Sequence, residues 1–397
     1  MVKKNAQKFF WTCGIVLFIA TSLYLALGTA DEDSMSEKEV SSGVSKTEEI
    51  SLNDNLVCID DSETKLKFVE KNYNKNKLNI PSDAIPLGSV NDDLIYYCIK
   101  DVQNEQIAFQ FFLQNMNTDA CELLFETNQC FTILGTSLVG ENIIFAEIKG
   151  ENDFIIELNA FSLKGKKQSS FEFATTSLPE IDVLDSKVIL SYDYLADEKI
   201  FQKIVAINVL EQEEVVVKEA EYSMNETMCS GVLLDGVKAT EKGVLFQEIC
   251  FENEEMFRDE SGVTKISFYD YETEMSEVLF ELPYKLSYIG GSAEYVVTNQ
   301  YSYEEPKENT GKILKKTDNA YVAYSIDQIG TINDIKNTWI FKDIVIIQCI
   351  YNTYVLDKCS MECSIINDSQ YVCVGDETSI IVKCSDGIYR IDLLNAT

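Results

Sequence analysis

Tyrosines lie close to carboxylates in three short stretches of this chain, and such residues could form a ligand-binding surface. The stretches are SYDYLAD at 191–197, FYDYETE at 268–274 and NQYSYEE at 299–305. An aromatic ring offers a flat apolar face and a neighbouring carboxylate accepts hydrogen bonds, which suits carbohydrates and peptides. The alternative is that these tyrosines only line strand edges. The predicted ligand-binding residues are Tyr192, Tyr194, Tyr269, Tyr271, Tyr301 and Tyr303.

Catalysis by paired carboxylates is the one enzymatic alternative that the composition leaves open. The chain has no histidine, which excludes Ser-His-Asp and Cys-His catalysis and every metal site that uses histidine. It also lacks G-x-S-x-G and the glycine-rich phosphate-binding motifs. Among its 66 acidic residues, Asp193 and Asp270 are candidates for a glycosidase-like pair, although outer-strand positions that face solvent explain them as well. We therefore expect no catalytic residue.

No metal site and no cofactor are expected either. The acidic clusters offer oxygen ligands for Ca²⁺, and Ca²⁺ is kept as an alternative, but the D-x-D-x-D-G spacing of a calcium loop is missing. A zinc site built from cysteines would need two C-x₂₋₄-C pairs, and the chain offers one, in KCSMECS.

Twelve cysteines are many for an exported chain. One of them, Cys13, lies in the apolar N-terminal segment, so an odd number remains and some thiols must stay unpaired. Several others sit in the middle of apolar strands and are predicted to pack as small buried hydrophobes. Cys359 and Cys363 flank a tight turn and are the best candidates for a disulfide.

The net charge of −33 argues against nucleic acid as a partner. Lys and Arg total 33 against 66 Asp and Glu, and a body this acidic repels phosphates and anionic lipid headgroups. The simplest role of the charge is to keep the surface soluble.

The N-terminal segment is predicted to anchor the chain in a membrane. Residues 9–28 form an uncharged apolar run of twenty, long enough to span the roughly 30 Å hydrocarbon layer as a helix. Lysines precede the run and acids follow it, so residues 1–8 are predicted to be a cytoplasmic tail. We interpret the run as an uncleaved signal anchor of a single-pass membrane protein, with a cleaved signal peptide as the alternative.

Residues 31–53 are predicted to be a flexible tether, because Ser, Glu and Lys dominate there and no aromatic residue occurs. Residues 54–397 follow as one extracytoplasmic domain. The 46% hydrophobic content of the chain is ample for a core.

A pair of apolar, aromatic-rich strands around a polar break recurs along this domain. The pairs are 93–101 with 106–115, 142–150 with 153–164, 187–195 with 202–212, 243–252 with 264–274, 294–304 with 320–328, 343–351 with 353–360, and 379–386 with 388–394. A third short strand follows most pairs and a strand-like lead-in precedes them. Four short antiparallel strands in each of seven repeats predict an all-β fold, a seven-bladed β-propeller.

The last repeat lacks its fourth strand, which predicts how the ring closes. Residues 55–61 or 64–71 precede the first repeat without a hairpin of their own, so we expect one of them to complete the last blade. An irregular β-sandwich is the alternative fold.

An N-terminal anchor, a polar tether and repeated hairpins such as NIIFAEIKG and DFIIELNAFSLK resemble the membrane-tethered propeller-repeat proteins of Gram-positive bacterial surfaces, broadly TolB-like. The resemblance implies a fold and a placement at the cell surface, and it transfers no site residue. The sequence thus predicts a surface-displayed module that binds or scaffolds a protein, peptide or glycan. The alternative is a carbohydrate-active enzyme with paired carboxylates at the propeller channel.

Overall fold

The chain divides into two units, Met1–Leu52 and Asn53–Thr397, and the structure, a computed structural model, describes only residues of the second. The predicted tail, anchor and tether at 1–8, 9–28 and 31–53 therefore lie outside the described residues. In the part of the chain that is described, there is no helix with the length and apolar character needed to cross a membrane. The described residues are 58–101, 107–127, 132–149, 154–175, 178–196, 199–224, 228–255, 263–300, 311–318, 320–326, 335–341, 343–376 and 378–393.

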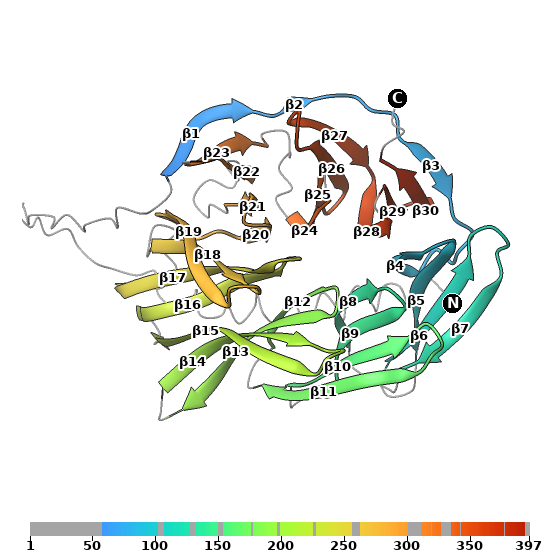
Figure 1. Ribbon diagram of the computed structural model, residues 1–397, viewed down its shortest axis with the longest axis horizontal. Coiled ribbons are helices and arrows are strands. Elements are labelled where there is room, and N and C mark those ends of the chain that lie inside the picture. The colour runs from blue at the N-terminus through green and yellow to red at the C-terminus, as the bar shows by residue number, and fades with distance from the viewer. Residues whose placement is uncertain are drawn as a thin grey trace, which may run out of the picture. The chain divides into compact units, whose positions relative to one another are not determined.

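Strands build all the regular structure of these residues, and they form seven antiparallel blades of four strands each. In every blade the first strand lies innermost (Figure 1). The innermost strands of successive blades contact one another, except that between blades 6 and 7 the contacts of β28 are with β25 and β26. Figure 1 shows the blades following one another around a central axis. The predicted seven-bladed propeller is thereby confirmed, whereas the alternative sandwich would gather the strands into two sheets.

The first three blades match the sequence repeats closely. Their strands, from the innermost outwards, are β4 (Ile85–Val90), β5 (Asp93–Asp101), β6 (Ile107–Asn115) and β7 (Cys121–Glu126) in blade 1; β8 (Thr132–Val139), β9 (Asn142–Ile148), β10 (Phe154–Ser162) and β11 (Lys167–Thr175) in blade 2; and β12 (Glu180–Leu184), β13 (Lys187–Ala196), β14 (Lys199–Asn208) and β15 (Glu213–Met224) in blade 3.

Blades 4 to 7 complete the ring. Their strands are β16 (Met228–Ala239), β17 (Gly243–Glu255), β18 (Val263–Asp270) and β19 (Met275–Leu282) in blade 4; β20 (Tyr288–Gly291), β21 (Tyr295–Asn299), β22 (Gly311–Lys316) and β23 (Ala320–Ser325) in blade 5; β24 (Ile335–Ile340), β25 (Ile344–Cys349), β26 (Asn352–Asp357) and β27 (Glu362–Asn367) in blade 6; and β28 (Ser369–Asp376), β29 (Ser379–Cys384), β30 (Gly387–Asp392) and β3 (Asn74–Lys77) in blade 7.

An Asx turn joins the third and fourth strands in four of these blades. In blade 4 the Asp270 side chain accepts hydrogen bonds from the next backbone N–H groups, and Glu274 then adopts the left-handed conformation. The same arrangement follows Asn115, Asn208 and Asp357. A short polar side chain that binds its own backbone favours a turn over a continuing strand, so this residue ends each third strand.

The ring closes as a clasp between the two ends of the domain, but with a different segment from the one predicted. β3 pairs antiparallel with β30 and supplies the outer strand of blade 7. Neither predicted segment does so: β1 (Cys58–Lys65) pairs with β23 of blade 5, and β2 (Lys67–Phe68) pairs with β27 of blade 6. Both pairings are parallel, and Figure 1 shows the segment running along the outer edges of three blades. We call residues 58–77 the strap.

Blades 3 and 4 differ from the others because they form one continuous eight-stranded sheet. The far end of β15 pairs with the start of β16, where Tyr222 lies opposite Gly231. Gly231 has a φ of +96°, and a Cβ there would lie 2.5 Å from the carbonyl oxygen of Glu221. Glycine therefore permits the close approach that fuses the two blades.

Candidate functional site

A network of polar side chains connects the innermost strands of blades 3, 4 and 6. The Lys238 ammonium of β16 lies 3.0 Å from Oδ1 of Asp182 on β12 and donates a 2.6 Å hydrogen bond to Oδ1 of Asn337 on β24. The other oxygen of Asp182 accepts a 2.8 Å bond from the backbone N–H of Ala239. The side chains of Lys238 and Asp182 are only 12% and 19% exposed, so each charge needs its partner.

A β-bulge in β16 lies directly before Lys238. The register of β16 against β17 shifts between Asp235 and Lys238, and Gly236 within the bulge has a φ of +61°. A Cβ at Gly236 would lie 2.6 Å from the Gln247 side chain, so glycine is required there on two grounds. Because the bulge releases backbone N–H groups from the ladder, those of Gly236 and Val237 are directed to the Glu180 carboxylate.

Glu180 is the carboxyl group with the most unusual environment in this network. The residue is solvent-exposed, and its carboxylate lies near Asp235, Asp182 and the backbone N–H groups of Gly236 and Val237. Desolvation, then the nearby charges of Asp235 and Asp182, raise the pKa of Glu180 to about 7, against the lowering effect of the two backbone N–H groups. Asp235 in turn lies 3.0 Å from the ammonium of Lys285. Chemically, the cluster can hold a proton near neutral pH or attract a cation.

The channel wall of blades 1 and 2 has a different chemistry. Gly88 and Gly135 occupy inner strands there, and a Cβ at Gly135 would lie 2.7 Å from the Val183 side chain of blade 3. A Cβ at Gly88 would lie 3.0 Å from the Val374 carbonyl oxygen of blade 7. Small residues let these strands approach closely, and the charged cluster therefore belongs to the side formed by blades 3 to 6.

The predicted residues Tyr192 and Tyr194 lie on β13. Tyr192 packs against the core between blades 2 and 3, which is a structural role. Tyr194 stacks on Phe201 with ring centroids 5.5 Å apart. Asp193 between them accepts a 3.2 Å hydrogen bond from the Tyr222 hydroxyl, so this carboxylate is not simply a solvent-facing group.

Tyr269 and Tyr271 lie at the opposite end of the blades. Tyr269 is buried in the core between blades 3 and 4. The Lys187 ammonium lies 3.5 Å from the centre of the Tyr271 ring, and the buried Tyr271 hydroxyl has no hydrogen-bond partner among the residues that the structure describes. Burial raises the pKa of Tyr271 and lowers that of Lys187. Asp270 caps the adjacent turn, which is a structural role.

The tyrosines do not converge on one surface. Lys187, which touches Tyr271, begins β13, and a rise of about 3.3 Å per residue places Tyr192 roughly 16 Å further along that strand. Tyr301 and Tyr303 lie outside the described residues. The structure therefore places the four described tyrosines in two separate groups, at opposite ends of the strands of blades 3 and 4.

The predicted disulfide between Cys359 and Cys363 is absent: both residues are free thiols. Cys359 is exposed in the turn between β26 and β27, whereas Cys363 points into the core between blades 5 and 6 and is 1% exposed. Desolvation raises the pKa of Cys363 to about 12. The turn therefore directs the two sulfurs into different environments. Cys349 and Cys373 are buried, as predicted, while Cys98 and Cys250 are only partly buried.

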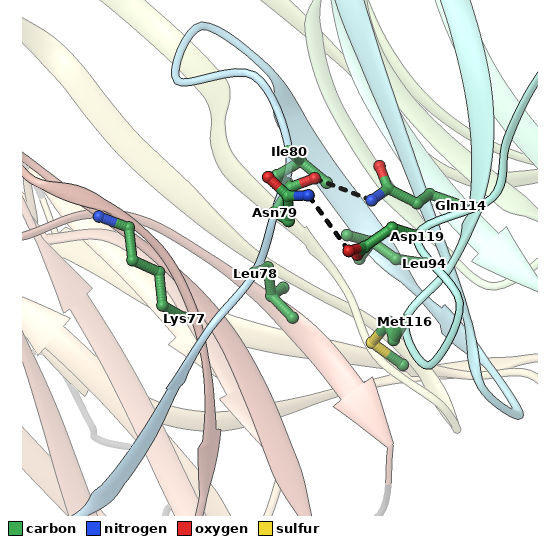
Figure 2. Close-up of a pocket in the computed structure, with 8 residues that line it drawn as sticks. All are labelled: Lys77, Leu78, Asn79, Ile80, Leu94, Gln114, Met116 and Asp119. Carbon is green, nitrogen blue, oxygen red and sulfur yellow. Dashed lines mark hydrogen bonds between the residues drawn. The ribbon is translucent and has the colours of Figure 1, made fainter.

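A cavity of about 260 Å³ lies where the chain leaves the strap and passes from blade 7 to blade 1 (Figure 2). Gln114 donates a 2.8 Å hydrogen bond to the Asn79 carbonyl, and the Asn79 amide donates one of 3.2 Å to Asp119. Figure 2 shows Lys77 turned away from these groups, and its ammonium donates instead to the carbonyl of Asp386. The cavity is smaller than the roughly 300–1,000 Å³ typical of ligand sites, and its polar groups are paired with one another.

Exposed apolar side chains are a feature that the sequence reasoning missed. Two of them, Val215 and Val216, lie near the start of β15, the outer strand of blade 3. Two more, Met275 and Val278, lie near the start of β19, the outer strand of blade 4. The stretches EEVVVKEA and MSEVLFEL contain these residues beside glutamates, but the sequence does not tell which of their apolar positions stay uncovered.

Among the described residues, no group of three or more acidic or cysteine side chains is placed to hold a metal ion.

Comparisons with known proteins show weak likeness to propellers. No family model matches the chain, and no curated protein matches it. Among solved structures, the β-propeller domain of the Trilobed protease from Pyrococcus furiosus is 14% identical with a TM-score of 0.49, over 79% of this chain and 97% of that one. An uncharacterised protein of Listeria monocytogenes EGD-e is 10% identical with a TM-score of 0.46, over 80% and 92%. The Pan2 WD40 domain of Neurospora crassa is 10% identical with a TM-score of 0.41, over 83% and 98%.

Proposed function

We propose that this chain is a non-enzymatic β-propeller that binds a protein, peptide or glycan, or scaffolds other proteins. The observation that carries the proposal is the contrast between two kinds of site. The charges in the channel are largely engaged with one another, whereas apolar side chains are left exposed on outer strands. A rigid ring with uncovered apolar side chains suits recognition of a partner.

The proposal includes display at the cell surface, on the basis of the amino-acid sequence. The apolar run at 9–28, with lysines before it and acids after it, would hold the propeller outside the membrane. A reporter enzyme fused after Thr397 should be active only outside the cytoplasm. Activity of the fusion inside the cytoplasm would contradict this placement.

The binding function is tested with the full chain in a screen against arrays of glycans and of surface proteins. We expect saturable binding to at least one class. Absence of binding to every class would contradict the proposal.

The second candidate, a carbohydrate-active enzyme, has one observation in its favour. Glu180 has a pKa raised to about 7, and Asp182 and Asp235 lie close enough to contribute to that shift. A proton-donating carboxyl beside an ionised one is the arrangement that glycoside hydrolysis requires. Against it, Asp182 is already bound by Lys238 and Ala239. Hydrolysis of any glycan in the screen that is abolished by Glu180→Gln would establish the enzyme and displace the binding proposal.

A further inference from the structure

The outer strands of blades 3 and 4 expose apolar side chains at equivalent places. Val215 and Val216 are the third and fourth residues of β15, and Met275 and Val278 are the first and fourth of β19. Met275 is 67% exposed and Val278 41%. Most of the other large apolar side chains exposed in the described residues lie singly on their elements, which is normal for a soluble surface. Two exposed apolar side chains on each of two adjacent outer strands distinguish this part of the rim from the rest.

The same position of the fold accepts an added strand in the next two blades. In blade 5 the outer strand β23 pairs in parallel with β1, and in blade 6 the outer strand β27 pairs in parallel with β2. In blade 4, β19 is the last strand of its sheet in the described part of the chain. Its outer backbone groups therefore present the same kind of edge that the strap covers in blades 5 and 6.

The charge around β19 specifies the partner. Glu272, Glu274 and Glu277 lie on or beside its exposed half, and the chain as a whole has a net charge of −33. Among the described residues, the ion pair of Glu277 is a distant one, 4.0 Å from the ammonium of Lys316. An edge with exposed apolar side chains among glutamates is complementary to a segment in which apolar residues alternate with Lys or Arg.

We propose that the outer edge of blade 4, formed by β19, binds an extended basic segment of a partner protein as an additional strand. This inference rests on the proposed binding function and identifies its surface and the kind of partner. Backbone hydrogen bonds to β19 provide the pairing, Met275 and Val278 contact the apolar residues of the segment, and the glutamates contact its cations.

The test uses labelled seven-residue peptides and the full chain. The probe alternates Val with Lys, one control alternates Val with Glu, and another carries N-methyl groups on alternate backbone nitrogens of the basic sequence. Fluorescence anisotropy should show binding of the basic peptide, at least about tenfold weaker binding of its N-methylated form, and no binding of the acidic one. A failure of the basic peptide to bind, or equal binding of its N-methylated form, would overturn the proposal.

Substitutions then locate the site. Met275→Glu with Val278→Glu removes the apolar contacts but adds negative charge, so a purely electrostatic interaction would tighten. We expect binding to weaken at least about tenfold. The matched control is Leu123→Glu, because Leu123 is 48% exposed on the outer strand of blade 1. It should leave binding unchanged, and equal weakening by both changes would contradict a site on blade 4.

The two proposals can fail separately. The screen for binding partners is repeated with the Met275→Glu, Val278→Glu chain. A partner that binds both chains equally would refute the blade 4 site and leave the binding function standing. If membrane vesicles or glycans rather than proteins prove to be the partners, the basic-strand proposal fails as well.

Discussion

Blades 3 and 4 and blades 5 and 6 have the same four-stranded plan, but they differ at the rim. Their inner strands share polar contacts, since Lys238 of blade 4 reaches Asp182 of blade 3 and Asn337 of blade 6. The outer strands of blades 5 and 6 are covered by the strap, whereas in the described chain β19 of blade 4 ends its sheet. Polar side chains of the inner strands join neighbouring blades, whereas the outer strands differ: β23 and β27 are paired with the strap, and β19, like β7 and β11, has no further strand beside it among the described residues.

A few apolar side chains hold the strap against the blades more strongly than its last strand, β3, does. Leu66 is 6% exposed in the core between blades 5 and 6, and Phe68 meets the Tyr354 ring edge-on at 6.4 Å. By contrast, the closing strand β3 has the sequence NKNK, and all four of its side chains are exposed. Its contribution comes mainly from backbone hydrogen bonds to β30.

The largest expected effect follows removal of the Lys238 side chain. Lys238→Ala leaves Asp182 without its cation and Asn337 without its donor, so we expect unfolding free energy to fall by about 3–5 kcal/mol. Chemical denaturation followed by fluorescence measures the change. Lys285→Ala, at a half-exposed pair with Asp235, is the control and should cost less than about 1 kcal/mol. Equal effects would mean that the channel network does not hold the blades together.

The second effect concerns the strap, which covers the outer strands of blades 5 and 6 but not that of blade 4. Leu66→Ala removes a buried side chain between blades 5 and 6, and we expect a loss of about 2–5 kcal/mol. Lys67→Ala, next to it, removes a mostly exposed pair with Glu362 and should cost less than about 1 kcal/mol. Melting temperatures of the two variants measure the difference. A small effect of Leu66→Ala would show that β3 alone closes the ring.

The blades could be predicted from the sequence because each repeats a pair of buried apolar strands. The prediction was wrong in blade 5, where 320–328 was paired with 294–304. The partner of β21 is instead β22, GKILKK, and residues 320–325 form the outer strand. Lysines flank this segment, but Ile313 and Leu314 at its centre are buried, and a run of two is too short to show a period.

The closing strand and the channel site could not be predicted, for a shared reason. β3 has no apolar residue, so its place in the sheet comes mainly from backbone pairing, to which Lys77 adds a hydrogen bond to the Asp386 carbonyl. Asp182, Lys238 and Asn337 are far apart in the sequence, and only the order of blades around the ring brings them together. The tyrosine stretches were visible because they are local, but they belong to different strands of blades 3 and 4, and the fold places them at opposite ends of those strands.

A smaller effect tests the environment of Glu180 at the inner end of blade 3. Its pKa is raised from the ordinary value of 4.5 to about 7, so between these values the folded chain binds the proton more tightly than the unfolded chain. The contribution of Glu180 to stability must then decrease as pH rises through that range. Glu180→Gln imitates the protonated form. The melting temperature of the variant minus that of the unaltered chain should be near zero at pH 4.5 and positive above pH 7.

The control for this titration is Glu180→Asp, which retains a carboxyl group and should keep part of the pH dependence. Many other acids titrate in the chain, but they cancel in the difference between two variants. A difference that stays flat from pH 4.5 to 8 would show that water at the channel mouth abolishes the shift. In that case the enzyme alternative would lose its one supporting observation.

The smallest change, the alkylation of single thiols, reports on strap opening without altering the fold. Cys363 lies opposite Phe68 of β2, its pKa is raised to about 12, and the strap helps to bury it. We expect iodoacetamide to modify the exposed Cys359 within minutes and Cys363 only when β2 separates from β27, because alkylation requires an accessible thiolate. Mass spectrometry of digests follows both residues over time.

Leu66→Ala should accelerate the modification of Cys363 and leave that of Cys359 unchanged. The buried Cys373 of blade 7, which does not lie under β1 or β2, is the control for global unfolding. If the alkylation of Cys363 and that of Cys373 accelerate together, the strap opens only when the whole ring unfolds. The outer strands of blades 4 and 6 would then differ in whether the strap covers them but not in local stability.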